Sequence, residues 1–172
     1  MAMSLMLAAL LAPMTAEVTH DAVTDRVRAT ATLRNGDYRL EVGCDPHEAR
    51  QVWVRLVSNR WFRIGDPLDQ GLFFTHRFDT RRPQRLKWRI DERRANLVGR
   101  SRVEPFVRWL TVSRNLVIRA NGPEGRRYDI NFEIEGARAA LDTALTACGD
   151  NFLDRQPRRG WWPRLPRLPL RL

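Results

Sequence analysis

Cysteine is scarce in this sequence, and its scarcity limits the kinds of site that the chain can form. The 172 residues include two cysteines, Cys44 and Cys148, which are far apart. Neither belongs to a CxxC pair or to a repeated ligand spacing, so the sequence predicts no zinc site. Two isolated cysteines in an exported chain instead predict one disulfide that closes a long loop. The alternative is a pair of buried free thiols in a cytosolic protein.

Long apolar runs are also missing, because the sequence has no stretch of about 20 apolar residues that could cross a bilayer. Residues 4–12 form a short apolar run of the size of a signal-peptide core, and small residues follow it. We therefore expect residues 1–16 to be a signal peptide that ends at Ala16, and the protein to be periplasmic or secreted. The leader has no basic residue before Arg26, which leaves open an N-terminal helix that packs on the core.

Motifs of known catalytic and cofactor sites are absent as well. The sequence has no nucleophile elbow and no glycine-rich phosphate loop, and its glycines mostly mark turns. His76 alternates with apolar residues, which is typical of a packed strand residue. Cys44 and His47 could begin a metal site, but no second pair of ligands has a suitable spacing. The sequence therefore predicts a protein that is not an enzyme and that needs no cofactor or metal.

Acidic residues are lacking from Arg155 to the end of the chain, where six of the ten net positive charges lie. Residues 151–172 form a basic tail rich in proline, tryptophan and arginine, and its prolines exclude a regular helix or a central strand. We expect this tail to be disordered, and its composition suits a membrane interface. The candidate interface residues are Trp161, Trp162, Arg158, Arg159, Arg164 and Arg167.

Lysine is nearly absent: Lys87 is the only lysine among 30 basic residues. Such a ratio is typical of a G+C-rich coding sequence, so it is weak evidence for phosphate binding. Two basic groups nevertheless lie in the body of the chain, within residues 26–39 and 81–89. They make nucleic-acid binding an alternative, which export would disfavour. We expect a protein partner in the envelope, with an anionic membrane surface as a second candidate partner.

Alternating apolar residues predict an antiparallel, strand-rich domain over residues 17–150. Residues 26–34 and 38–44 alternate strictly, and Asn35-Gly36 between them favours a type I′ hairpin turn. Further strands are expected around residues 52–56, 62–64, 72–78, 86–90, 116–118 and 127–135. Apolar spacings of three and four predict two helices, near residues 103–112 and 137–148. The predicted fold class is α+β, and both cysteines fall on its inward rows.

The order of these features resembles a known family. The hairpin that ends in Cys44 is followed by "THRFD", Trp88, the short helix "VEPFVRWL", "LVIRA" and a final helix that ends in Cys148. Residues 17–149 resemble the VasI-like (TagO-like) family, small exported Gram-negative proteins associated with type VI secretion. The resemblance implies an accessory role in the cell envelope and implies no catalytic residue. The matching residues include Arg77 and Asp79, which we expect to form a structural or binding pair. The other matching positions are Phe78, Phe106, Leu110, Arg119, Phe132, Gly136 and Leu141.

Overall fold

The protein is built around one antiparallel sheet. The computed structural model describes residues 13–44, 52–60, 62, 71–121 and 126–155. Within these residues, nine strands lie in the order β1-β2-β3-β4-β7-β6-β5-β8-β9. The strands are β1 (Thr15–Asp21), β2 (Arg26–Asn35), β3 (Tyr38–Cys44), β4 (Val52–Ser58), β5 (Gly71–Phe78), β6 (Gln84–Asp91), β7 (Arg94–Leu97), β8 (Asn115–Asn121) and β9 (Arg127–Glu133).

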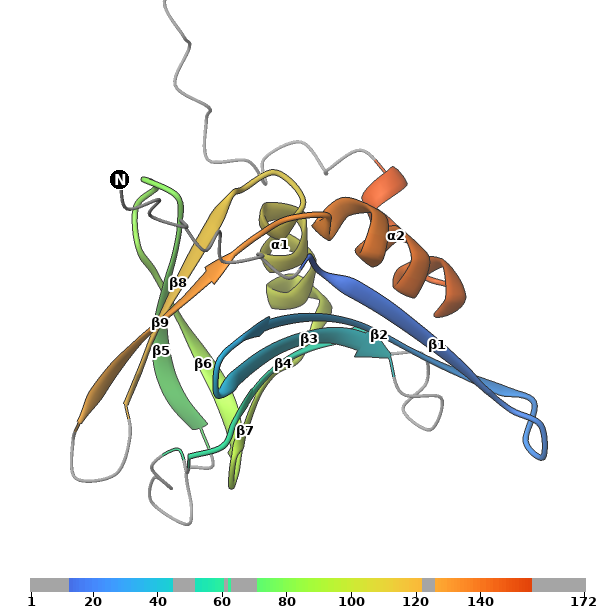
Figure 1. Cartoon of the computed structure of the whole chain (residues 1–172), viewed down its shortest axis with the longest axis horizontal. Helices are drawn as coiled ribbons and strands as arrows, with labels where there is room; N and C mark the ends of the chain where they lie inside the picture. Colours follow the sequence, from blue (N-terminus) through green and yellow to red (C-terminus); the bar gives the residue numbers. More distant parts are fainter. Residues whose placement is uncertain (1–12, 45–51, 61, 63–70, 122–125, 156–172) are drawn as a thin grey trace, which may run out of the picture.

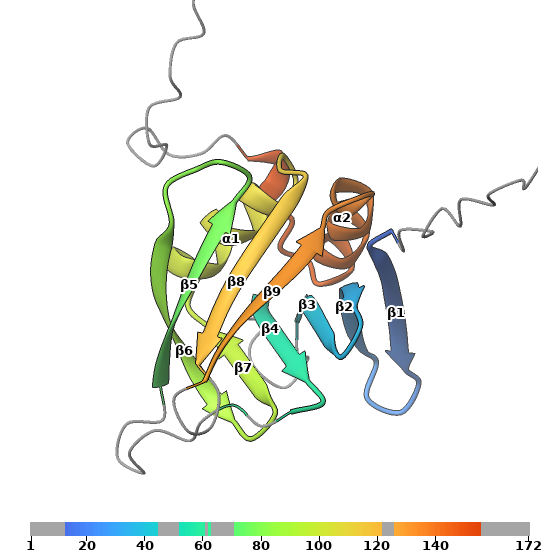
Figure 2. The ribbon, with the colours of Figure 1, turned by 60° about the vertical axis from the view of Figure 1, so that its left-hand side comes forward.

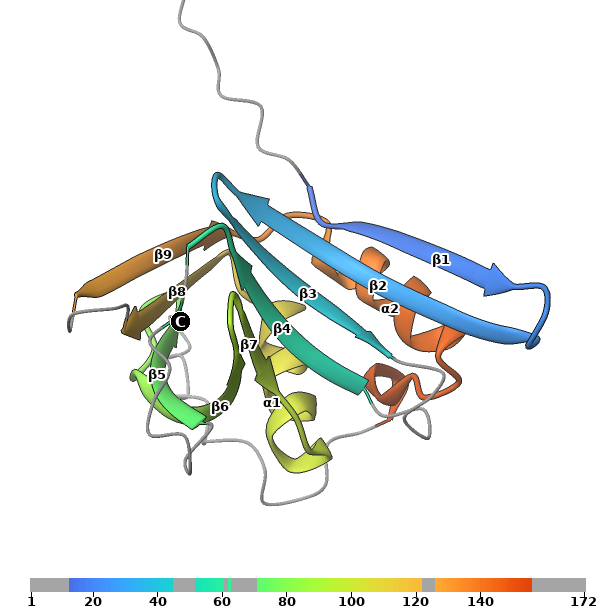
Figure 3. The same cartoon turned by 90° about the horizontal axis from the view of Figure 1, so that it is seen from below.

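Two helices accompany the sheet, as the sequence predicted. They are α1 (Arg100–Leu110) and α2 (Ala137–Ala147), and a short 3-10 helix, η2 (Phe152–Asp154), follows α2. The sheet curves strongly, and both helices lie on its concave side (Figures 1 and 3). None of the described helices is long and apolar enough to cross a membrane. The architecture confirms the predicted α+β class with a predominance of strands.

The first hairpin shows how the sequence dictates the sheet. On β2, Ala29, Ala31 and Leu33 are buried, whereas the polar residues between them face outward. The turn differs from the expected one, because Asn35 pairs with Tyr38 and the two-residue loop is therefore Gly36-Asp37. Gly36 has a φ of 53°, and of these two loop residues it alone has a positive φ. A glycine at the first central position is the requirement of a type II′ turn.

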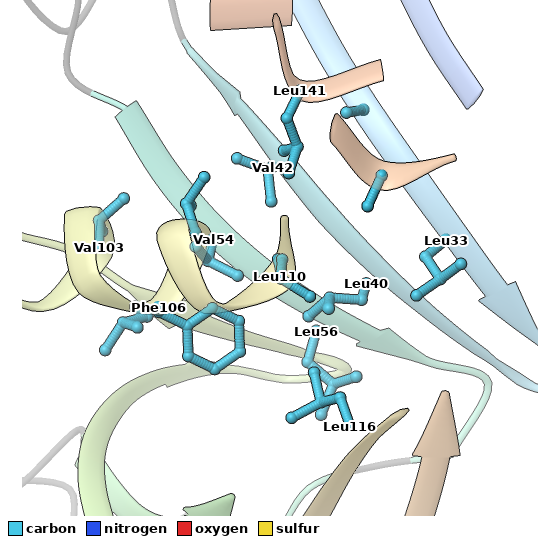
Figure 4. Packing of buried hydrophobic residues seen from close by; sticks show 14 of the residues in the cluster. Leu33, Leu40, Val42, Val54, Leu56, Val103, Phe106, Leu110, Leu116 and Leu141 are labelled. Atoms are coloured by element: carbon cyan, nitrogen blue, oxygen red, sulfur yellow. The ribbon is translucent and has the colours of Figure 1, made fainter. Parts of the chain in front are cut away.

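The concave face of the sheet holds the core. Leu110 of α1 lies among the leucines of the central strands, and Leu141 of α2 points toward Val42 of β3 (Figure 4). Phe106 of α1 packs at ring-centroid distances of 5.1 Å from His76 and 5.8 Å from Trp88. Offset and edge-on contacts of this kind stabilise aromatic clusters beyond their buried area. The two helices thus cover different parts of one continuous core, α2 over the first strands and α1 over the centre.

Strand β7 was not predicted from the sequence. Its four residues lie in "RIDERRANL", which reads as a polar segment, yet Ala95 and Leu97 are fully buried. β7 pairs with β6 through a tight turn and with β4 on its other side. It therefore joins strands β1–β4 to the strands β6, β5, β8 and β9 (Figure 2).

Candidate functional site

The predicted disulfide is present. Cys44 is the last residue of β3 and Cys148 caps the C-terminal end of α2, and their sulfurs are bonded at 2.03 Å with a Cα–Cα distance of 5.9 Å. Both residues are buried, with 2% and 5% of their surface exposed. The bond ties the last helix to the sheet across a sequence separation of 104 residues. It is a structural bond, because neither sulfur is accessible as a reactive group.

Arg77 and Asp79 are not brought together as an ion pair. Arg77 faces the convex side of the sheet and is exposed, and among the described residues it has no acidic partner. Asp79 has a φ of 47°, and its Oδ1 accepts hydrogen bonds from the backbone N–H groups of Arg114 (3.0 Å) and Asn115 (2.9 Å). Asp79 therefore fastens the end of β5 to the start of β8. Its role in the described structure is structural.

The structure bears on the predicted leader, but not on the predicted interface residues of the C-terminal tail. The six candidate interface residues of the tail lie outside the described residues. Met14 is buried, and its N–H donates to the carbonyl of Glu135 at 2.8 Å. Ala16 is the second residue of β1 and pairs with Ala31. Cleavage after Ala16 would therefore remove Met14 from the core and shorten β1 from its N-terminal end.

Burial strongly perturbs the protonation of His76. Desolvation lowers its pKa to about 4, and a hydrogen bond with the Gln84 side chain opposes this shift. The imidazole is therefore neutral at neutral pH and is enclosed by Phe78, Phe106 and their neighbours. Among the described residues, no group of three His, Cys, Asp or Glu side chains could hold a metal ion. His76 is 3% exposed and packs against aromatic rings of the core, as its strand position predicted.

A shallow hollow of about 310 Å³ lies beside the β6–β7 turn. Its polar groups are largely engaged in the fold: the Ser58 hydroxyl accepts from the Arg60 N–H at 2.9 Å, and the Ser58 N–H donates to the Arg93 carbonyl at 3.0 Å. The turn contributes Asp91, Glu92, Arg93 and Arg94, so charges of both signs line the hollow.

The convex face of the sheet carries the clearest candidate binding surface. Strand β6 directs Arg85, Lys87 and Arg89 outward, alternating with Leu86, Trp88 and Ile90 on the core side. Residues two apart on a strand place their side chains about 7 Å apart, so the three cations span about 13 Å. Neighbouring strands add one cation each. We call the resulting set the convex strip: Arg77, Arg85, Lys87, Arg89 and Arg94.

An exposed aromatic ring lies within the convex strip. Phe73 is 46% exposed and pairs across the strands with Lys87. The guanidinium of Arg85 lies 4.5 Å from the centre of the Phe73 ring, a cation–π contact. Sequence reasoning included Arg81 in this basic group, but the structure places the Arg81 guanidinium over the Trp109 ring, at 3.8 Å. It missed Phe73 and Arg94, whose proximity depends on strand pairing.

Three arginines of the helical layer differ from those of the convex strip because carboxylates neutralise them. Arg138 contacts Asp142 at 2.8 Å and Asp154 at 3.2 Å. Arg108 contacts Glu104 at 3.0 Å, and Arg100 reaches the same carboxylate at 3.4 Å. In the convex strip, by contrast, Arg77, Arg85, Arg89 and Arg94 have no carboxylate within 4.0 Å among the described residues.

Acidic residues of the described part of the chain border the convex strip. Asp91 is opposite Arg94 in the strand register, at the turn end of β6. On the other side, Arg119 holds Asp129 through two hydrogen bonds of 2.7 Å, and these keep the pKa of Asp129 below its usual range. Asp129 of β9 is thus already paired with Arg119 of the adjacent strand β8. The strip keeps an excess of positive charge that is exposed to solvent.

Comparisons with protein-family models, with curated proteins and with solved structures found no match.

Proposed function

We propose that the protein is a non-enzymatic binding protein of the cell envelope, which acts outside the reducing cytosol and binds an anionic surface through the convex strip. The observation that carries the proposal is a set of four exposed arginines on β5, β6 and β7, Arg77, Arg85, Arg89 and Arg94, which no carboxylate of the described residues neutralises. The buried Cys44–Cys148 bond supports an oxidising compartment, because such bonds are rare in cytosolic proteins. The resemblance to VasI-like proteins supports an accessory role beside an envelope assembly such as a type VI apparatus.

The chemistry of the convex strip favours phosphate-bearing lipid headgroups. Guanidinium groups bind phosphate oxygens in a bidentate manner, and an exposed phenylalanine is suited to the interfacial region of a membrane. Near an anionic surface each basic residue contributes about 1 kcal/mol. Anionic phospholipids and the lipid part of lipopolysaccharide both offer this chemistry. Nucleic acid offers phosphates too, but a disulfide-bonded envelope protein meets little of it.

Vesicle co-sedimentation with the full chain tests the binding surface. The strip variant Arg77→Gln, Arg85→Gln, Arg89→Gln should bind anionic vesicles about 100-fold more weakly than the native chain, from three lost contributions of about 1 kcal/mol. A control that removes three neutralised arginines, Arg100, Arg119 and Arg138, should bind within a few-fold of the native chain. Equal losses in the two variants would show that net charge alone matters and would refute the proposal.

The C-terminal tail is a separate candidate for the same activity. Replacing Arg158, Arg164 and Arg167 by glutamine in the full chain removes the same number of charges from the tail. The proposal expects this variant to retain most of the vesicle binding. A loss confined to the tail variant would assign the activity to the tail, and tighter binding of DNA than of vesicles would favour the nucleic-acid alternative.

The proposed location in the cell envelope can be tested independently of the binding surface. Cell fractionation followed by thiol alkylation, with and without reduction, should place the protein in the periplasm with both cysteines protected until they are reduced. The mass of the same material would show where the mature chain begins, and so whether Met14 is retained. Recovery in the cytosol with free thiols would refute the envelope assignment.

A further inference from the structure

Strand β1 presents an open sheet edge. It bonds to β2 along one side over its seven residues, and on its other side no described residue pairs with it. All seven residues are exposed, and the β1–β2 hairpin extends beyond α2 (Figures 1 and 3). An unpaired edge leaves backbone N–H and C=O groups available to another strand, and proteins commonly block such edges. β1 has neither a proline nor a lysine to block it.

The opposite edge of the sheet is partly blocked. The curvature of the sheet brings β9 against β2, although the two strands are far apart in the strand order. The side-chain amide of Asn35 donates a hydrogen bond to the backbone carbonyl of Asn131 in β9. This contact occupies an acceptor of β9 and places the β2–β3 turn beside it. β1 is therefore the edge that is open for pairing.

We infer that β1 pairs in antiparallel fashion with β1 of a second copy of this chain, centred on Val18. In this register Val18 lies opposite Val18 of the second copy, Glu17 lies opposite Thr19 of that copy, and Ala16 lies opposite its His20. Val18 is 46% exposed and lies on the core side of the sheet, since its partner on β2 is the buried Ala29. Pairing therefore covers one of the large apolar side chains that the single chain leaves exposed.

Charge selects this register over its neighbours. Antiparallel registers that keep each face of the sheet continuous differ by two residues along the strand. Moving the centre to Glu17 places that glutamate opposite its own copy. Moving the centre to Thr19 places Glu17 opposite Asp21. Like charges directly opposite each other destabilise strand pairing, so the Val18-centred register is favoured.

The pairing has a consequence for the convex face. A two-fold axis through Val18, perpendicular to the sheet, keeps the convex sides of both copies on the same side of the continuous sheet. The dimer would thus present two convex strips together, and two linked sites bind one surface more tightly than either alone. The pairing itself does not rest on the proposed function, so failure of either leaves the other standing.

The position of Val18 on the two-fold axis provides a direct test with the full-length protein. Val18→Lys and Val18→Glu each place like charges opposite one another, and each should weaken self-association at least about fivefold in sedimentation equilibrium. Mixing the two variants places opposite charges at the axis and should restore the dimer. Val112, which is 57% exposed at the end of α1, provides matched controls, Val112→Lys and Val112→Glu, which should dimerise as the native chain does.

Circular dichroism checks that the Val18 variants fold. If they do not, Val18→Cys replaces them, because a cysteine on the two-fold axis should form an intermolecular disulfide on oxidation, whereas Val112→Cys should not. A native chain that stays monomeric throughout a concentration series would overturn the inference. A dimer whose stability is unaffected by the charged substitutions at position 18 would overturn the register. So would a dimer that is not restored by mixing the two charged variants.

Discussion

Removal of the disulfide should destabilise the protein by several kilocalories per mole. The Cys44–Cys148 bond joins residues 104 positions apart. The chain-entropy relation gives about 4 to 5 kcal/mol for a loop of this length, through loss of the constraint on the unfolded chain. Natural domains are stable by about 5–15 kcal/mol, so this one bond supplies from a third to nearly all of such a value. The double variant Cys44→Ala, Cys148→Ala removes the bond without leaving a buried hydroxyl.

Urea unfolding measures this loss directly. With a slope of about 2 kcal/mol per molar urea, the midpoint should fall by about 2 M. Reductant provides the control, because it should destabilise the native chain toward the variant and leave the variant unchanged. Since both sulfurs are buried, reduction should be slow until the protein opens. A midpoint that falls by less than about 0.5 M would refute the entropic argument and show that the packing of α2 holds the fold unaided.

Three further changes test the local structure. His76 has its pKa lowered from 6.5 to about 4 by burial, so its contribution to stability is complete above pH 6.5 and is lost as the pH falls to about 4. The loss should be about 3 kcal/mol and should be absent from His76→Leu, as paired unfolding curves at several pH values would show. Asp79→Ala should lower stability by about 1–3 kcal/mol, because two backbone N–H groups lose their acceptor, whereas Asp79→Asn should cost less; thermal unfolding compares them. Gly43→Ala should cost about 1–3 kcal/mol, since a Cβ there would lie 2.6 Å from the carbonyl oxygen of Ala29; urea unfolding measures it.

Local patterns in the sequence predicted the elements that have enough residues to show a period. The ten residues of β2 and the eleven of α2 repeat their apolar positions several times, so both were recognised. The same patterns placed Cys44 and Cys148 on inward rows, which favoured a bond between them but left buried free thiols as the alternative. The four residues of β7 contain only two inward positions, too few to reveal a period. β1 escaped recognition for another reason, because it directly follows an apolar run that resembles a leader.

The convex strip could not be predicted from the sequence, because its composition depends on which strands are neighbours in the sheet. Arg138 and Arg85 look alike in the sequence, but Arg138 has an acid four residues on, which a helix brings to its side. The outward neighbours of Arg85 are set by which strands flank β6, and these are β7 and β5. Neither neighbour directs an acidic side chain toward the strip. The exposed charge on which the proposed function depends is therefore a property of strand order, and strand order depends on the pairing of β4 with β7, a strand that the sequence pattern did not reveal.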